Sequence, residues 1–335
     1  MDAREAQGRG FLLGKFMPPH AGHRLLLDFA GQFCRELTVL VCSLPDDPIP
    51  GERRLAWVSE LAPRANVLHL ADPMPQEPSE SPDFWDIWRR AIRTKESRAI
   101  SFVFASEPYG ERLAYELGAR FIPLDVRREL VPISGTMIRQ DPIGHWEYLP
   151  ECVRPYFVKR VCLVGPESAG KSTLATTLAR RFATTYAWEH ARPLLDLKGG
   201  KCDPEDIPLI ARSQIAIEEA AARRANRVLF CDTNVLLTKI WSEVLFGMCP
   251  GWIEHEAATK RYDLALLLEP DIPWVDDSQR YFPDTERRRQ FFDRCRRELD
   301  RVGQPYAIIS GSFTEREAAA IEAVRQATGL NATAK

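Results

Sequence analysis

Residues 158 to 182 read VKRVCLVGPESAGKSTLATTLARRF, and this stretch decides the fold of the second half of the chain. It contains GPESAGKS at 165 to 172, which matches the P-loop pattern GxxxxGK[ST] between a strand-like run and a helix-forming run. Glycines let backbone N–H groups surround phosphate oxygens at a helix N-terminus, where the helix dipole also favours an anion. The stretch therefore predicts an α/β domain that binds nucleotide phosphates.

The P-loop supplies the first candidate site residues. Lys171 is expected to reach the β- and γ-phosphates, and the Ser172 hydroxyl to bind Mg²⁺. Asp232 ends the apolar run VLFC at 228 to 231, where P-loop enzymes commonly keep a carboxylate that holds Mg²⁺. An ordinary strand-end aspartate is the alternative. The loop residues expected to contact ATP are Gly165, Glu167, Ser168, Gly170, Lys171, Ser172 and Thr173.

Two further stretches are expected at the same edge of the sheet, which faces the ligand crevice in open α/β folds. Glu189 and Arg192 lie in TTYAWEHAR, where Glu189 either binds an acceptor's hydroxyls or acts as a base, with a surface ion pair as the alternative. Arg280, after the run LALLLEP, is expected to close over the transferring phosphate unless it belongs to a solvated charge cluster. The remaining expected substrate-binding residues of that stretch are Trp274, Asp277 and Tyr281, whose aromatics either sandwich a flat ring or pack in the core.

The whole chain predicts two α/β domains, each a doubly wound parallel sheet. Its 335 residues exceed what one core usually organises, and short apolar runs alternate with amphipathic stretches in both halves. A proline-rich and aromatic segment separates the two series, so we expect domains at residues 1 to 152 and 153 to 335.

The composition is typical of a soluble protein, with 45% hydrophobic and 27% charged residues and a net charge of −2. Neither nucleic acid nor a membrane is an expected partner, and no signal peptide or membrane span is apparent, so we expect the cytoplasm. The eight cysteines form no CxxC pair, which favours reduced core residues over a metal site.

Two motifs in the first half indicate a second phosphate site. GKFMPPHAGH at 14 to 23 follows the first strand-like run, and imidazoles at a helix N-terminus can donate hydrogen bonds to phosphate oxygens. A zinc site would need Cys or acidic ligands that this motif lacks. In ISGTMIR at 133 to 139, Ser134 and Thr136 can cap a helix while Arg139 points at the same anion.

These motifs resemble those of a known superfamily. GKFMPPHAGH is similar to the GxFxPxHxGH signature of nucleotidylyltransferases, and ISGTMIR to its partner motif ISxTxIR. Together with FASEPYGERLAYELGARFIPLD, HWEYLPECVRPYFVKRV and GPESAGKST, they resemble the NadR-type bifunctional family along nearly the whole chain. That family joins a Rossmann-like nicotinamide-nucleotide adenylyltransferase to a P-loop ribosylnicotinamide kinase.

The resemblance implies that the kinase half makes NMN from ribosylnicotinamide and ATP, that the other half makes NAD and pyrophosphate from NMN and ATP, and that Mg²⁺ assists. It implies that Trp88, rather than Trp85, stacks on nicotinamide. The residues expected to contact ATP in the first half are Gly14, Lys15, Phe16, His20, His23, Ser134, Thr136 and Arg139. The residues expected to be catalytic are His20, His23, Arg139, Lys171, Glu189, Asp232 and Arg280.

Some relatives of this family begin with a helix-turn-helix domain that represses genes, and because only about ten residues precede the first expected strand, we expect no such domain here. Two alternatives remain. A fused phosphopantetheine adenylyltransferase and dephospho-CoA kinase would pair the same two folds, and a regulator would bind NAD and ATP without turning them over. The sequence leaves a homo-oligomer open.

Overall fold

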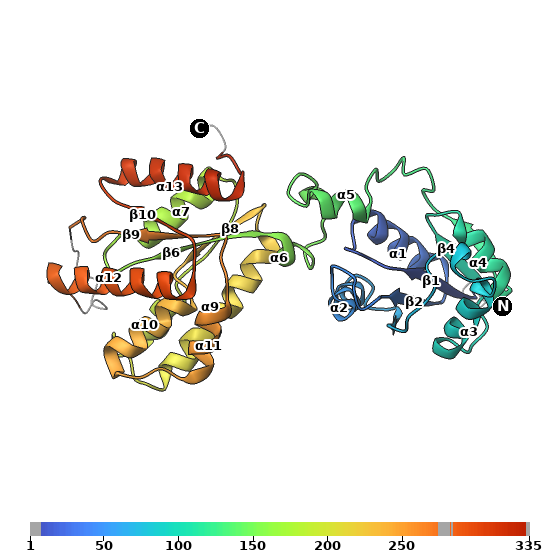
Figure 1. Cartoon of the computed structure of the whole chain (residues 1–335), viewed down its shortest axis with the longest axis horizontal. Coiled ribbons are helices and arrows are strands. Elements are labelled where there is room, and N and C mark those ends of the chain that lie inside the picture. The colour runs from blue at the N-terminus through green and yellow to red at the C-terminus, as the bar shows by residue number, and fades with distance from the viewer. Residues whose placement is uncertain (1–7, 274–281, 283, 333–335) are drawn as a thin grey trace. The chain divides into compact units, whose positions relative to one another are not determined.

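The computed structural model describes residues 8 to 273, 282 and 284 to 332. The chain divides into two compact units, Met1–Val153 and Arg154–Lys335 (Figure 1). Trp274, Asp277, Arg280 and Tyr281, which the sequence nominates for the second site, lie outside the described residues. Each unit contains one parallel five-stranded sheet with helices packed on it, which confirms the predicted fold class.

The first unit is built on a sheet with strand order β3-β2-β1-β4-β5. The order reverses between β1 and β4, because β2 and β4 pair with opposite edges of β1. Ligands bind at such switch points, outside the carboxyl ends of the strands. The strands are β1 Arg9–Gly14, β2 Glu36–Cys42, β3 Asn66–Leu70, β4 Phe102–Ala105 and β5 Arg120–Pro123.

The helices of this unit pack on the sheet by their apolar faces. α1 contacts β2 and β4, α2 contacts β2 and β3, and α4 contacts β4 and β5. One buried cluster joins strand residues such as Phe11 and Leu40 to Trp88 and Ile92 of α3. The helices are α1 Ala21–Phe33, α2 Gly51–Leu61, η1 Pro78–Glu80, α3 Phe84–Lys95, α4 Tyr109–Leu117, α5 Gly135–Gln140 and η2 Trp146–Tyr148.

The second unit has strand order β10-β9-β6-β8-β7, again all parallel. The strand before the P-loop, β6, lies in the middle of this sheet, between β9 and β8. The short edge strand β7 pairs with β8 through two residues only. The strands are β6 Lys159–Val164, β7 Tyr186–Ala187, β8 Val228–Asp232, β9 Leu264–Leu268 and β10 Tyr306–Ile309.

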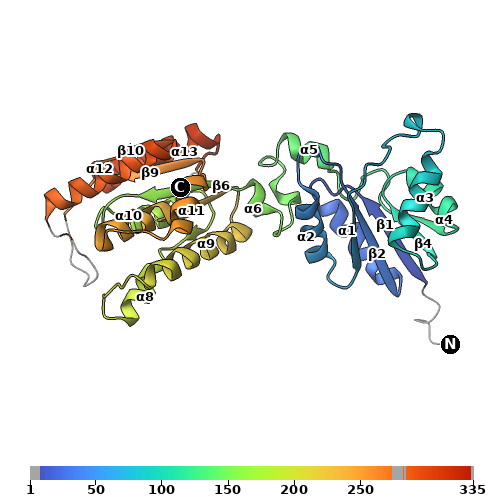
Figure 2. The same cartoon turned by 60° about the horizontal axis from the view of Figure 1, so that its bottom comes forward.

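Helices cover both faces of this second sheet. α7 and α13 pack on one face, and α9, α10 and α12 on the other (Figure 1). Figure 2 shows α8 beside α9, its neighbour along the chain. The helices are α6 Arg154–Phe157, α7 Lys171–Arg181, α8 Ala191–Leu197, α9 Asp206–Arg224, α10 Val235–Phe246, α11 Gly251–Thr259, α12 Thr285–Val302 and α13 Phe313–Thr328.

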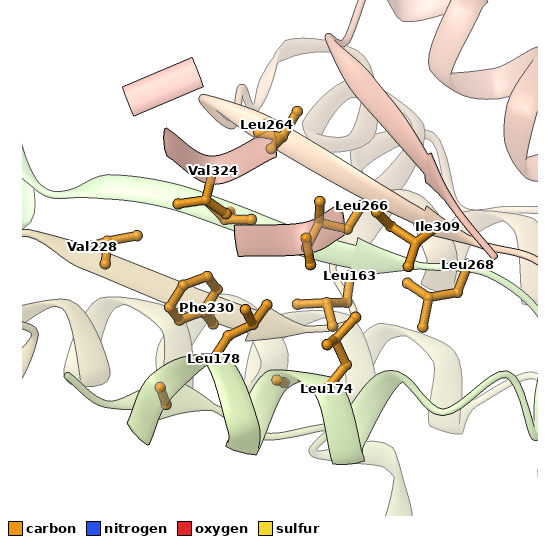
Figure 3. Packing of buried hydrophobic residues seen from close by; sticks show 14 of the residues in the cluster. Leu163, Leu174, Leu178, Val228, Phe230, Leu264, Leu266, Leu268, Ile309 and Val324 are labelled. Atoms are coloured by element: carbon orange, nitrogen blue, oxygen red, sulfur yellow. The ribbon is translucent and has the colours of Figure 1, made fainter. Parts of the chain in front are cut away.

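The core under the P-loop is aliphatic. Leu174 and Leu178 of α7 point toward strand residues that include Leu163, Phe230 and Leu266 (Figure 3). These side chains fix α7, and with it the phosphate-binding loop, against the centre of the sheet. Among the described residues, no helix combines the length and apolar character needed to cross a bilayer.

We expect Leu178→Ala to lower the free energy of unfolding of the second unit by about 2–5 kcal/mol, because it leaves a cavity in a packed core. Leu178 is fully buried, whereas Leu209 of α9 is half exposed and serves as the control. Leu209→Ala should change that free energy by no more than about 0.5 kcal/mol. Native-state hydrogen exchange of the amides in β6 and β8 measures both values, and equal losses would contradict this account of the core.

Candidate active sites

The first candidate site is the histidine pair at the N-terminus of α1. β1 ends at Gly14, and the following loop leads to His20, which caps the helix. Nδ1 of His20 accepts the backbone N–H of Gly22 at 3.2 Å, and Nδ1 of His23 accepts the backbone N–H of His20 at 3.3 Å. The two ring centroids lie 3.8 Å apart. The two imidazoles thus build a capping box, which fixes their orientation.

Both imidazoles are neutral at neutral pH. Burial, followed by the charge of Arg128, lowers the pKa of His20 to about 4. Burial and then the neighbouring His20 and Arg128 lower the pKa of His23 well below its ordinary value. Since Nδ1 of each ring accepts a backbone N–H, the ring proton sits on Nε2. The pair therefore presents two neutral N–H donors, a form suited to binding phosphate oxygens.

Helix α5 contains most of the motif ISGTMIR, and it lies against the loop of the motif GKFMPPHAGH. Ser134 caps α5 by accepting the N–H of Met137 at 3.2 Å. The Arg139 guanidinium donates to the Met17 carbonyl and, at 3.1 Å, to the Thr136 hydroxyl. Gly135 lies so close that a Cβ there would sit 2.7 Å from the Met17 carbonyl oxygen. The structure thus joins the loop before His20 to ISGTMIR, as the pairing of the motifs suggests.

A buried arginine that the sequence does not reveal supports this site. Arg54 of α2 is 0% exposed, and its guanidinium donates to the carbonyls of Lys15 at 2.7 Å and Cys42 at 3.1 Å. It also forms an ion pair with Asp47 at 2.6 Å. Arg54 therefore ties together the chain segments that leave β1 and β2.

The other predicted site residues of this unit differ in their solvent exposure. Phe16 is buried against the His23 ring, with 4.9 Å between centroids, so its side chain supports the histidine. Lys15 is exposed.

Trp88 packs in the core, donates its indole N–H to the Pro75 carbonyl at 2.9 Å, and lines a cavity of only about 10 Å³. The Arg112 guanidinium carbon lies over the Trp85 ring, 5.7 Å from the ring centroid.

The second candidate site is formed by the P-loop. Gly165 has a φ of 148° and a Cβ there would lie 2.8 Å from the Leu268 carbonyl oxygen, so only glycine fits. Gly170 precedes α7 in the left-handed conformation. Lys171 curls over the loop and donates from Nζ to the carbonyls of Gly165 at 3.1 Å and Pro166 at 2.9 Å. The loop thus leads from β6 into the N-terminus of α7, in the strand–loop–helix order that the sequence predicts.

A cavity of about 400 Å³ opens beside this loop. Asp232, 2% exposed, lines it together with Ser172. Burial and the nearby Glu189 carboxylate raise the pKa of Asp232 to about 6. The lining residues are Ser168, Ala169, Gly170, Lys171, Ser172, Thr173, Tyr186, Trp188, Glu189, Arg192, Pro193 and Asp232.

This donor set fits a magnesium ion that is shared with phosphate. Asp232 Oδ1 is buried and has no hydrogen-bond partner among the described residues. The Ser172 hydroxyl group belongs to the same cavity. A hydroxyl and a carboxylate are the two protein ligands that P-loop enzymes offer to Mg²⁺. In the described part of the chain, no group of three or more His, Cys, Asp or Glu side chains forms a complete metal cage. A metal here would take its remaining ligands from nucleotide phosphates and water.

Part of the cavity lining comes from the segment that follows β7. Glu189 lies two residues beyond the strand and pairs with Arg192 at 3.1 Å. The His190 backbone N–H donates to the buried Gln214 side chain at 3.1 Å, which anchors the segment to α9. Trp188 also lines the cavity, although no sequence pattern singles it out from the other tryptophans.

Glu167 links the P-loop to a distant part of the chain. Its carboxylate accepts the backbone N–H of Phe282, and Phe282 stacks on Trp241 of α10 with centroids 5.5 Å apart. The side chain therefore has a structural contact in addition to its place in the loop.

A second buried arginine, Arg316, binds a backbone carbonyl of the P-loop. Arg316 of α13 is 2% exposed, and its guanidinium donates to the carbonyls of Ala169 and Glu269, both at 2.9 Å. Its Nε donates to the Gly311 carbonyl at 2.8 Å, and it pairs with Asp271. The P-loop and the segments after β9 and β10 therefore share one anchor.

Comparisons with known proteins relate the chain to one group. The protein-family model described as AAA domain matches residues 160 to 316. The chain is 30% identical to the trifunctional NAD biosynthesis/regulator protein NadR of Escherichia coli (strain K12) over 310 residues, covering 86% of this chain and 75% of that protein.

Two solved structures share the fold over nearly the whole length. A NadR protein in complex with NAD and AMP-PNP has a TM-score of 0.77, and a NadR protein in complex with NR has one of 0.80. Each is 21% identical to this chain, and each comparison covers 98% of both chains. At that identity the likeness concerns the fold.

The protonation of the histidine pair is directly measurable. Long-range ¹H–¹⁵N correlation spectra should show protons on Nε2 of both rings, with no titration of His20 down to about pH 5.5. Because the pKa of His20 falls to about 4 from 6.5, the folded state binds this proton less tightly than the unfolded chain. Its contribution to stability is complete above pH 6.5 and is lost as the pH falls toward 4.

The matched variant for this measurement is His20→Asn, which keeps a side-chain cap and removes the titrating ring. Its free energy of unfolding in urea should decline less between pH 6.5 and pH 4 than that of the wild type. A His20 ring that titrates near 6.5 in the folded protein would overturn the assignment.

Arg316→Met should lower the free energy of unfolding by about 2–5 kcal/mol, because three carbonyls lose a charged donor. It should also weaken the binding of a nucleoside triphosphate at least roughly tenfold, because the P-loop loses its anchor, with Arg316→Lys intermediate. Arg325→Met on the same helix removes only an exposed pair with Glu322 and should change neither value. Calorimetric binding and thermal unfolding test this, and wild-type affinity in folded Arg316→Met would contradict it.

Proposed function

The chain belongs to the NadR family, and from this premise we propose that it is a bifunctional enzyme of NAD biosynthesis, a ribosylnicotinamide kinase and a nicotinamide-nucleotide adenylyltransferase. The observation that carries the proposal is the cavity of about 400 Å³, which is lined both by the P-loop and by Glu189, Arg192 and Asp232. The neutral histidine pair of the first unit supports the second activity.

In the proposed kinase reaction, the ribose 5′-hydroxyl of ribosylnicotinamide attacks the γ-phosphorus of ATP and ADP leaves. The loop N–H groups and Lys171 bind the phosphates, and Ser172 and Asp232 would hold Mg²⁺, which supplies charge neutralisation. A carboxylate that binds a metal is not free to take a proton. Glu189, in the same cavity, is therefore our choice for the base that accepts the hydroxyl proton, and Arg192 orients it through their ion pair.

In the proposed adenylyltransferase reaction, a phosphate oxygen of NMN attacks the α-phosphorus of ATP in line, and pyrophosphate leaves. No covalent enzyme intermediate forms, so rate comes from positioning and from stabilising charge. The Nε2–H groups of His20 and His23 donate to phosphate oxygens as charge builds. Ser134, Thr136 and Arg139 bind the β- and γ-phosphates of the departing pyrophosphate.

Several finer assignments belong to the same proposal. We assign ATP contacts to Gly14, Lys15 and the Phe16 backbone, and nicotinamide stacking to Trp88. Since the cavity beside Trp88 is about 10 Å³, a pyridine ring can reach this indole only if the lining segment moves. We also propose that the enzyme acts in the cytoplasm. The remaining assignments, for which the described residues give no geometry, are Trp274, Asp277, Arg280 and Tyr281.

The alternative of a fused phosphopantetheine adenylyltransferase and dephospho-CoA kinase has the same two fold types. The family membership favours nicotinamide substrates. A regulator that only senses NAD and ATP would also bind ATP through Lys171 and Ser172, but it would have no need for a carboxylate such as Glu189 in the same cavity, where an acceptor hydroxyl could be deprotonated.

The two activities should separate in single variants of the full chain. Lys171→Ala should abolish formation of NMN from ribosylnicotinamide and ATP, and leave formation of NAD from NMN within about threefold. His23→Ala should do the reverse, because it removes one donor from the other phosphate site. Chromatographic assay of NMN and NAD with each substrate measures both.

Phosphopantetheine serves as the control substrate in the same assay. Consumption of phosphopantetheine and of neither nicotinamide substrate would replace our assignment with the alternative. Loss of both activities in each variant, with unchanged circular dichroism, would show that the sites are not independent.

A further inference from the structure

The loop between β5 and α5 carries an arginine that the catalytic roles above do not use. Residues 124 to 133 connect the edge strand β5 to α5. In this loop the Asp125 carboxylate accepts the backbone N–H groups of Leu130 and Val131, both at 3.0 Å. Asp125 and Arg128 have positive φ values of 51° and 54°, a conformation that residues other than glycine rarely adopt. Such strained residues cluster at functional sites.

The same loop lies against the histidine pair of the first unit. A Cβ atom on Gly22 would be 3.9 Å from Cγ1 of Val131, so the loop reaches the first turn of α1. Burial is the largest cause of the low pKa of His20 and of His23, and the charge of Arg128 contributes to both. The Arg128 guanidinium therefore belongs to the electrostatic environment of the first phosphate site.

Glu107 is the partner of Arg128. Its carboxylate accepts a hydrogen bond from the Arg128 guanidinium at 3.2 Å, and about half of each side chain is exposed. Glu107 follows β4 by two residues, and the nearby Tyr109 hydroxyl donates to the Leu13 carbonyl of β1 at 2.8 Å. This ion pair therefore lies near the carboxyl ends of β1 and β4, where the strand order reverses and ligands bind.

The histidine pair needs more positive charge to bind a triphosphate. His20 and His23 are neutral donors, and the Arg139 guanidinium already donates to a carbonyl and a hydroxyl. A nucleoside triphosphate with one divalent ion remains an anion. An exposed ion pair contributes little because solvent screens it, whereas arginine can bind a phosphate through two hydrogen bonds. Exchange of the Glu107 carboxylate for a phosphate is therefore favourable.

We propose that Arg128 is a catalytic residue of adenylyl transfer, which leaves Glu107 when ATP binds and donates to the phosphate oxygens that become pyrophosphate. The inference rests on the proposed adenylyltransferase function and extends it. As the NMN phosphate oxygen bonds to the α-phosphorus, the bond from that phosphorus to the bridging oxygen breaks, and its electron pair stays with pyrophosphate. Arg128 stabilises this charge and transfers no proton, because a guanidinium stays protonated in proteins.

Arg128→Asn tests the proposal in the full chain, because asparagine tolerates a positive φ and removes the charge. The kcat for NAD formation from NMN and ATP should fall roughly 100- to 1000-fold, and the KM for pyrophosphate in the reverse reaction should rise roughly tenfold. The KM for NMN should stay within about threefold, and the kinase rate of the same preparation within about twofold. Arg128→Lys, which keeps the charge without the planar group, should be intermediate.

Arg127→Asn is the matched control, because Arg127 is the neighbouring residue of the loop, is 88% exposed and lies 3.8 Å from its partner Glu129. It should leave both reactions within about twofold. Unchanged NAD formation in folded Arg128→Asn, or an equal loss in Arg127→Asn, would overturn the role of Arg128.

Glu107→Gln tests the exchange of partners. ATP should bind roughly two- to fivefold more tightly to the first unit, because no carboxylate competes for Arg128. Unchanged or weaker ATP binding in this variant would overturn the exchange.

Calorimetric titration with Mg²⁺ and ATP measures this binding without turnover, in chains that also carry Lys171→Ala to weaken the P-loop site. Adding Arg128→Asn to that background should lower the remaining ATP affinity roughly tenfold, and adding Arg127→Asn should not. If the affinity falls in this way and the wild type makes no NAD, the proposed function fails and the phosphate contact stands. If the wild type makes NAD and Arg128→Asn changes neither affinity nor rate, the proposed function stands and the role of Arg128 is overturned.

Discussion

Both phosphate sites depend on a buried guanidinium that binds the carbonyl groups of the segments leaving the strands. Carbonyls at the end of a parallel sheet have no further strand to pair with, and burying them without a donor costs free energy. Arg54 meets this need for β1 and β2, and Arg316 for the P-loop, β9 and β10. Arginine suits the task because its planar group carries five donors and keeps its charge when buried.

The two sites differ in the groups that they offer to an anion. The first unit presents neutral imidazole donors, whose low pKa values follow from burial and from the nearby Arg128. The second unit places a lysine of the P-loop and a buried carboxylate, that of Asp232, in the lining of one cavity. Neutral donors can stabilise charge as it develops without binding a ground-state anion too tightly, whereas a lysine and a metal suit phosphates that are charged throughout.

Much of this organisation can be predicted from the sequence, because the informative residues are neighbours along the chain. The strand, loop and helix around Lys171 and the spacing of His20 and His23 each encode local backbone geometry, and the alternating apolar runs predict both parallel sheets. The arginine anchors cannot be found in this way, because Arg316 and Ala169 are separated by 147 positions. The solvent exposure of a side chain is equally hard to predict, since nothing in the sequence distinguishes the buried Trp88 from the half-exposed Trp188. The same holds for the imidazole tautomers, which depend on backbone donors.

The edge strand β7 has only two residues, and the segment that carries Glu189 and Arg192 follows from it. The P-loop, by contrast, follows the central strand β6, and the aliphatic core and Arg316 fix its position. Substitutions after β7 thus disturb one short ladder, whereas substitutions near the P-loop disturb the whole sheet. In the proposed kinase, the segment that would bind the acceptor thus follows a two-residue edge strand, whereas the loop that would bind phosphate is anchored at the centre of the sheet. A scaffold divided in this way offers a route to new nucleoside kinases by redesign of a single peripheral segment.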